Sequence, residues 1–239
     1  MDPREHPRRL ATTRWSMIAR AASSESERQE ALGELCEAYW YPLYSFVRRS
    51  GHGADEAADL TQEFLTRFLE RRDVERTGPE RGRFRSYLLQ AMRNFLANDW
   101  RNRAAQKRAM TAPAIPIDAA FAESRYAAEP GEISDPERLF LRRFAMTALE
   151  AALEELGAEC ERAGKGALFA ALRSSLVGEL EPGDYAHVAG ALAMSSGAVK
   201  VAAHRLRARF RDHVRAQLAD TLEDERDVDD EITFLMGAL

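Results

Sequence analysis

The sequence predicts an all-α fold in which two small helical domains are joined by a flexible linker. Apolar residues recur at three- and four-residue intervals, and no segment shows the two-residue alternation of a half-buried β-strand. A chain of 239 residues is long enough to close two modest hydrophobic cores. We therefore expect an N-terminal domain at 1–108, a linker at 109–137, a C-terminal domain at 138–219 and an acidic tail at 220–239.

Three helices are predicted before the most basic part of the N-terminal domain. The first is short and holds Trp15 and Ile18. The second carries a long apolar face through Pro42, where we expect a bend, and it ends near Gly51. The third is predicted over 55–72, with one apolar face for its neighbours. Its polar side presents Asp59, Gln62, Glu63 and Arg67.

Residues 80–108 form the most informative segment, because their pattern predicts one helix with an apolar face and a basic, amide-rich face. Asn is a mediocre helix former, so amides at four-residue steps indicate a role beyond solubility. Amides beside guanidinium groups can hydrogen-bond base edges while the guanidinium groups hold phosphates. A solvated surface helix is the alternative. The apolar face comprises Phe84, Leu88, Ala91, Met92, Phe95, Leu96 and Trp100, and the outward face comprises Arg85, Gln90, Arg93, Asn94, Asn98, Arg101, Asn102, Arg103, Lys107 and Arg108.

A second basic stretch, 184–218, predicts two helices separated by a short break that Ser195 or Ser196 can cap. Ala189, Ala193 and Val199 match the small, turn and apolar positions of a helix-turn-helix. A positive φ at Ala193 would strain that residue where Gly would be unstrained. An ordinary helical hairpin is the alternative. The predicted inward face of the second helix is Val199, Ala203, Leu206, Phe210 and Val214, and its outward face holds Lys200, His204, Arg207 and Arg211.

Charge is distributed in blocks along the chain. The net charge of −5 by itself argues against nucleic-acid binding. However, 80–108 holds eight Lys or Arg residues against two acidic ones, and 184–218 holds six against two. The predicted linker and the tail carry the acidic excess. Two separate basic faces suggest two contacts with nucleic acid.

The tail is almost purely acidic from Asp220 to Glu231, after which apolar residues return at helical spacing. A short amphipathic helix capped by Asp227 or Asp229 is therefore predicted. So short a helix is not stable alone and needs a surface. We expect it to dock on the C-terminal domain, where it either completes the core, which is the simpler interpretation, or competes with phosphate for basic side chains. Its predicted apolar stripe is Ile232, Leu235, Met236 and Leu239.

The sequence predicts no catalytic, cofactor or metal site. Its five histidines lack metal-ligand spacing, no glycine-rich phosphate loop is present, and no Ser or Cys lies in a nucleophile motif. Cys36 and Cys160 lie far apart on apolar faces, which predicts buried thiols. No apolar run approaches the length of a membrane span and the N-terminus lacks a signal-peptide core, so we expect a cytoplasmic protein with no membrane partner.

Three motifs in this order resemble the extracytoplasmic-function (ECF) sigma factors of bacterial RNA polymerase. Asp59-Leu-Thr-Gln-Glu-Phe resembles the helix that docks on the polymerase clamp. FRSYLLQAMRNFLANDWRNR resembles the adjoining segment that melts the promoter and reads its minus-ten element, and MSSGAVKVAAHRLRARFRDHV resembles the helix that reads the minus-thirty-five element. WYPLYSFVRRSG and ERGRFRSYLL resemble the planctomycete and myxobacterial branch in particular. The chain departs from the family at Ala193, where the turn usually has Gly.

The resemblance implies recognition without covalent chemistry. The N-terminal domain would bind the clamp, open the duplex and hold a flipped base, and the C-terminal domain would enter the minus-thirty-five major groove. There Lys200 and Arg207 would read bases, while Arg205, Arg209 and Arg211 would hold phosphates. The implied clamp contacts are Asp59, Gln62, Glu63 and Phe64; the minus-ten contacts are Arg93, Asn94, Asn98, Arg101, Asn102 and Arg103; the minus-thirty-five contacts are Ser195, Ser196, Lys200, His204, Arg205, Arg207, Arg209 and Arg211.

The implied partners are core RNA polymerase, at its clamp and flap regions, and promoter DNA. An anti-sigma factor or a regulatory kinase is the implied controlling partner. The main alternative is a dimeric helix-turn-helix regulator that acts without core polymerase. A pure helical scaffold, which would bind no DNA, is a further alternative.

Overall fold

The computed structural model describes residues 25–70, 83–103, 119–177, 182–219, 221–222 and 224–239, and every regular element among them is a helix. The all-α fold class is therefore confirmed. The chain divides into two compact units, of which the first combines 1–147 with 219–239 and the second is 148–218. The short helix predicted around Trp15 lies outside the described residues.

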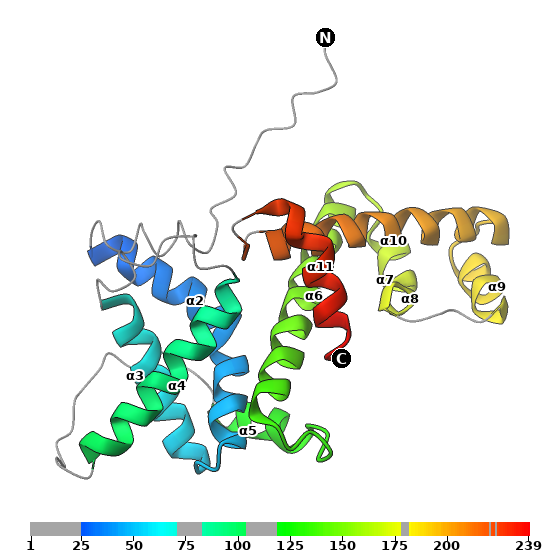
Figure 1. The fold of residues 1–239 in the computed structure, drawn as a ribbon. Coiled ribbons are helices and arrows are strands. Elements are labelled where there is room, and N and C mark those ends of the chain that lie inside the picture. Colours follow the sequence, from blue (N-terminus) through cyan, green and yellow to red (C-terminus); the bar gives the residue numbers. More distant parts are fainter. Residues whose placement is uncertain (1–24, 71–82, 104–118, 178–181, 220, 223) are drawn as a thin grey trace. The chain divides into compact units, whose positions relative to one another are not determined.

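Three helices form the centre of the first unit, namely α2 (Glu25–Arg49), α3 (Ala54–Glu70) and α4 (Phe84–Arg103) (Figure 1). α2 continues through Pro42, whose carbonyl accepts a hydrogen bond from Ser45 at 2.8 Å. The turn into α3 contains Gly51 at φ 103°, a left-handed conformation that Gly adopts without strain. The shared core includes the fully buried side chains of Leu43, Tyr44, Leu60, Leu65, Phe84, Leu88 and Met92.

The structure differs from the predicted linker, because the second half of that segment is folded onto the first unit. It forms α5 (Ala119–Ala127), which packs on α3. Glu123 of α5 accepts hydrogen bonds from the Tyr44 hydroxyl at 2.5 Å and from Arg48 Nε at 2.9 Å. The hydrogen bond from Arg48 lowers the pKa of the Glu123 carboxyl, while burial raises the pKa of the Tyr44 hydroxyl. Residues 109–118 lie outside the described part of the chain.

α6 (Pro136–Arg162) follows, and its first turns belong to the first unit. Asp135 caps the helix by accepting a hydrogen bond from the Glu137 amide at 2.9 Å. Just before the cap, Glu129 accepts a hydrogen bond from the Tyr41 hydroxyl at 2.8 Å and pairs with Arg143 of α6. These contacts fasten α6 to α2.

The acidic tail ends in a short 3₁₀ turn, η3 (Glu225–Asp227), and in α11 (Val228–Met236). The predicted short helix is thus confirmed, and Asp227 occupies its N-cap position but makes no side-chain capping hydrogen bond. Its buried residues are Val228, Glu231 and Leu235, whereas Met236 and Leu239 of the predicted stripe are exposed. The expected docking site is wrong: the tail belongs to the first unit, because Glu231 pairs there with Arg85 of α4.

The second unit contains the end of α6, α7 (Gly166–Leu172), α8 (Ser174–Val177), α9 (Pro182–Ala191) and α10 (Ser196–Ala219). The predicted inward face of α10 is confirmed, and Leu218 extends it by one more turn. Cys160 lies buried in this unit as a free thiol, as Cys36 does in the first. Burial raises the pKa of the Cys160 thiol, so it acts here as a small apolar side chain.

Ala193 lies between α9 and α10 with φ 51°. This is the left-handed conformation that Gly adopts without strain and that strains Ala. The Met194 amide donates to the Ala189 carbonyl at 2.9 Å and so closes the end of α9.

Ala193→Gly is expected to raise the free energy of unfolding by about 0.5 kcal/mol, because relief of strain exceeds the added entropy of the unfolded chain. Urea unfolding measures this. Ala216→Gly, at an exposed position inside α10, is the control and should lower the same quantity by about 0.5–1 kcal/mol.

Candidate nucleic-acid interface

One side of α3 forms a polar edge. Asp59 is exposed, Gln62 and Glu63 are partly exposed, and Glu63 pairs with Arg67 at 2.5 Å. Phe64 does not belong to this edge. Its side chain is 3% exposed and its ring lies 5.4 Å from Phe68 and 5.7 Å from Phe95. Phe64 is thus a core residue of the free protein that lies beneath the edge, and the polymerase contact expected there stays a prediction.

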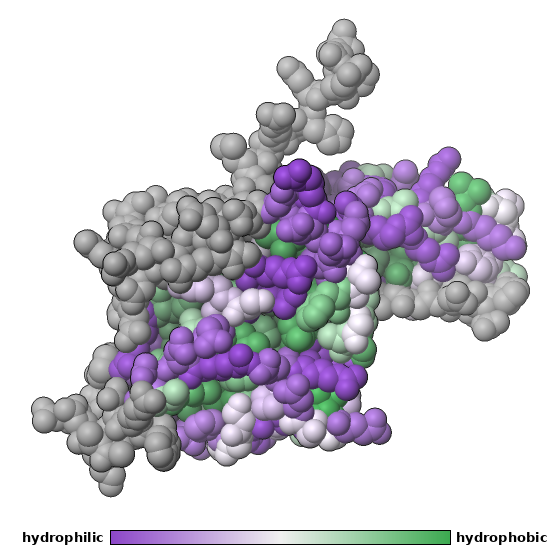
Figure 2. All heavy atoms as spheres, viewed as in Figure 1, coloured by the Kyte–Doolittle hydropathy of each residue, from purple (hydrophilic) through white to green (hydrophobic). Residues whose placement is uncertain are grey.

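α4 presents the predicted row of amides to solvent. Gln90, Asn94 and Asn98 are exposed, and the Gln90 amide nitrogen donates to Asn94 Oδ1 at 3.1 Å. Leu88 and Met92, on the opposite side of the helix, are fully buried. In Figure 2 a hydrophilic band crosses the face on which α4 lies, next to apolar surface. Each amide offers hydrogen-bond donors and an acceptor, and base edges carry the matching acceptors and donors.

The arginines of α4 are divided between two environments. Arg93 is partly exposed and pairs with Glu137 of α6, so its charge is balanced in the free protein. Arg85 was expected on the outward face, but it is 6% exposed because Glu231 of the tail supplies a buried partner. The side chains of Arg101, Asn102, Arg103 and Trp100 lie outside the described part of the chain, although the helix itself extends to Arg103.

α10 begins with a side-chain cap and then presents a basic side. Ser195 Oγ accepts a hydrogen bond from the Ala198 amide at 3.2 Å, which assigns Ser195 to helix capping and leaves Ser196 exposed at the first position. The outward residues Lys200, His204 and Arg211 are exposed and lie within about 40° of one another around a 3.6-residue helix.

Val201 is an interface candidate that the sequence analysis missed. It is 51% exposed on the outward arc of α10, beside Lys200. Lys200 Nζ in turn lies 5.8 Å from the Tyr185 ring of α9. The missed signal was the position of Val201 on the helical wheel, opposite the inward face, where it also lines the cavity described below. An exposed apolar side chain there can contact a thymine methyl group.

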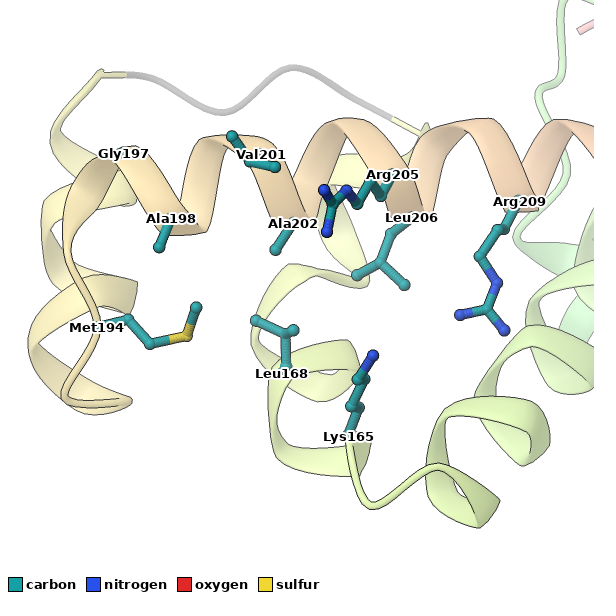
Figure 3. Close-up of a pocket in the computed structure, with 10 residues that line it drawn as sticks. All are labelled: Lys165, Leu168, Met194, Gly197, Ala198, Val201, Ala202, Arg205, Leu206 and Arg209. Carbon is teal, nitrogen blue, oxygen red and sulfur yellow. The ribbon is translucent and has the colours of Figure 1, made fainter.

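Two other arginines of α10 have partners within the second unit. Arg207 Nε donates to the Ser175 carbonyl at 3.0 Å, and Arg209 pairs with Glu159. Arg205 and Arg209 line a cavity of about 500 Å³, into which Leu206 and Arg209 extend from α10 toward Lys165 and Leu168 (Figure 3). The basic residues of α10 thus divide into an outward set and a set that contacts other parts of the second unit.

Residues 35–106, which include most of α2 and all of α3 and α4, match the family model for Sigma-70 region 2. The first unit contains a Sigma-70 region 2 domain. The match covers less than a third of the 239 residues, and comparisons with curated proteins and with solved structures found no match. The region 2 domain supports a sigma factor role in which the protein binds core RNA polymerase. Sigma factors are not enzymes.

The core of the region 2 domain connects the polar edge of α3 with the amide row of α4. Phe68 and Tyr87 lie 5.7 Å apart between the two helices, and the Arg67 guanidinium lies 5.7 Å from the Phe95 ring. Aromatic contacts of this kind hold neighbouring helices in a fixed register. The amide row of α4 would therefore keep a constant position relative to a partner bound at the polar edge of α3.

Among the residues that the structure describes, no helix is long and apolar enough to cross a membrane. The same residues contain no group of three His, Cys, Asp or Glu side chains placed to hold a metal ion.

Proposed function

We propose that this protein is an ECF-type sigma factor that binds core RNA polymerase and directs initiation at specific promoters. The observation that carries the proposal is the Sigma-70 region 2 match, which covers the helices that bear the polar edge of α3 and the amide row of α4. The outward basic side of α10 supports a second contact with DNA. The planctomycete and myxobacterial branch, and control by an anti-sigma factor or a kinase, stay predictions from the resemblance.

Core polymerase would bind at the polar edge of α3. Asp59, Gln62 and Glu63 lie within two turns of the helix, so a single partner surface can meet all three. Phe64 and Leu60 are buried directly beneath them and keep the backbone of this edge rigid. Polar groups on a rigid support favour a specific interface because little side-chain and backbone entropy is lost on binding.

The minus-ten element would bind along α4. Asn94 and Asn98 are one turn apart, about 6 Å along the helix axis, and each can pair with the edge of an unstacked base. Arg93 can exchange Glu137 for a phosphate. Arg101, Asn102 and Arg103 continue the same helix and extend the proposed contact with the single strand.

The minus-thirty-five element would bind α10, with α9 and α10 acting as a helix-turn-helix. Lys200 and His204 lie in the first turns of α10, where a recognition helix enters the major groove. Arg211 lies two turns further along and suits a phosphate, while Ser196 can hold a phosphate at the helix start. Because Arg207 bonds to Ser175, Arg209 pairs with Glu159 and Arg205 lines the cavity, we assign these three arginines to contacts within the second unit.

Lys200→Ala is expected to lose about 1–3 kcal/mol of discrimination at one or two bases of the minus-thirty-five element, with unchanged stability. Arg207→Ala is the contrasting variant. Because Arg207 bonds to the Ser175 carbonyl, its loss should lower the melting temperature and weaken binding equally for all sequences. Competition binding with single-base promoter variants measures both. Base-specific loss in Arg207→Ala and not in Lys200→Ala would reverse the two assignments.

Pull-down of purified core polymerase by the full-length protein tests the proposal. A sigma factor is expected to bind core directly and to bind promoter DNA strongly only in that complex. A dimeric helix-turn-helix regulator would bind a palindrome alone and would leave core polymerase unbound. That result would replace the proposed function with the alternative.

A further inference from the structure

The C-terminal helix α11 is anchored to the start of α4 by a buried ion pair. Glu231 is fully buried, and its carboxylate accepts hydrogen bonds from Arg85 Nε at 2.5 Å and Arg85 Nη2 at 3.0 Å. Arg83 Nε lies 2.8 Å from the same carboxylate, and the Phe234 ring covers the Arg85 guanidinium at 4.3 Å. A carboxylate withdrawn from water in this way is stable only while cationic partners stay beside it.

Backbone contacts fasten both ends of the tail to the first unit. The amide of Phe84, the first residue of α4, donates to the Thr221 carbonyl at 3.0 Å. This bond satisfies one of the N–H groups that the first turn of a helix leaves without a partner. At the other end, Arg142 of α6 donates to the Leu239 carbonyl. Val228 and Leu235 are buried between these points. The tail is therefore held at its start, middle and end.

The anchor lies on the side of α4 that faces away from the amide row. Arg85 and Asn94 are nine residues apart, which corresponds to about 180° around a 3.6-residue helix. Arg85 instead shares its side of the helix with the buried residues Leu89 and Met92. α11 consequently supports α4 from behind and leaves Asn94 exposed. This geometry argues against a tail that blocks the amides directly.

We propose that α11 is a cis-acting lock that fixes α4, with Arg83 and Arg85 as the receptor for Glu231. The receptor comes from the first half of the chain and the lock from its last residues, so the first unit is completed only after the second unit has been synthesised. A chain that ends before α11 would leave Arg85 without its counter-charge. The lock thus makes the first unit depend on α11.

Hydrogen exchange of the full-length protein tests the lock. Glu231→Leu leaves Arg85 buried without a partner, so amide exchange in α11 and the first turn of α4 should rise about a hundredfold. Adding Arg85→Met removes both charges and should restore most of the protection and of the melting temperature. Asp230→Asn, at an exposed neighbouring position, is the control and should change neither. If Glu231→Leu does not fold, Glu231→Gln replaces it in the experiment. This variant keeps the shape of the side chain and one acceptor, so we expect a smaller rise in exchange at the same amides.

Unchanged exchange in both α11 and α4 would overturn the lock. A rise confined to α10 would overturn it too, because it would place the tail on the second unit. Failure of the double variant to recover would remove the assigned role of the ion pair. None of these outcomes depends on the proposed function.

A second readout rests on the proposed function. In Glu231→Leu, open-complex formation should fall while core binding persists, because α3 is not touched. Tighter promoter binding by this variant would instead show that α11 inhibits α4, and would overturn the lock. Failure of the unchanged protein to bind core would refute the sigma factor role and leave the exchange result standing.

Discussion

Replacing Asp59, Gln62 and Glu63 together by Ala is expected to abolish binding to core polymerase while the protein stays folded. The three side chains form the polar edge of α3 and point away from the core, so each change should alter the free energy of unfolding by no more than about 0.5 kcal/mol. The loss of the Glu63–Arg67 pair falls within that range, because an exposed i, i+4 pair contributes only about 0.3–0.5 kcal/mol. Binding of fluorescently labelled protein to core measures the effect.

Asp55→Ala provides a matched control on the same helix. Asp55 is an exposed carboxylate in the first turn of α3, one turn before the proposed edge. Its replacement should leave core binding within about twofold. If the triple variant loses its cooperative thermal transition together with core binding, the edge is part of the folded core and is not a docking surface.

Asn94→Ala combined with Asn98→Ala is expected to abolish open-complex formation on duplex promoters and to spare transcription from pre-melted templates. The two amides are proposed to hold a base that has left the stack, and a template that is already open no longer requires that step. Ala is a better helix former than Asn, so the variant should be at least as stable as the unchanged protein. A loss of activity therefore cannot be attributed to unfolding of α4.

Permanganate footprinting of unpaired thymines measures melting in this experiment. Ser86→Ala, at an exposed position near the start of α4, is the control and should melt the promoter normally. Normal footprints in the double Asn variant would remove the amide row from the mechanism, even if core binding is confirmed.

Local periodicity was sufficient to predict the faces of the long helices. In α10 the apolar residues at three- and four-residue steps all lie inward, and in α4 Gln90, Asn94 and Asn98 all lie outward. Each of these positions follows from which side of a helix is apolar. Arg207 shows the limit of this argument, since it lies at the border of the two faces and its direction is decided by the Ser175 carbonyl.

Contacts between distant residues were not predictable in the same way. α5 was missed because its apolar pattern is weak, and it is held by Glu123 bonded to Tyr44 and Arg48, about 75–79 residues earlier. The pair of Arg85 with Glu231 spans 146 residues, and each residue taken alone resembles an ordinary surface charge. Helical periodicity does not show which charged residues will pair across the chain. The docking site of the tail is therefore visible only in the three-dimensional structure.

Run-off transcription with purified core polymerase tests the central claim most directly. When this protein is added to core and a library of genomic fragments, we expect discrete transcripts that are absent with core alone and absent with the triple Ala variant of α3. Discrete start sites that share upstream sequence elements would agree with promoter-specific initiation by a sigma factor. The absence of any transcript that depends on the protein, together with binding of palindromic DNA by the protein alone, would contradict the account.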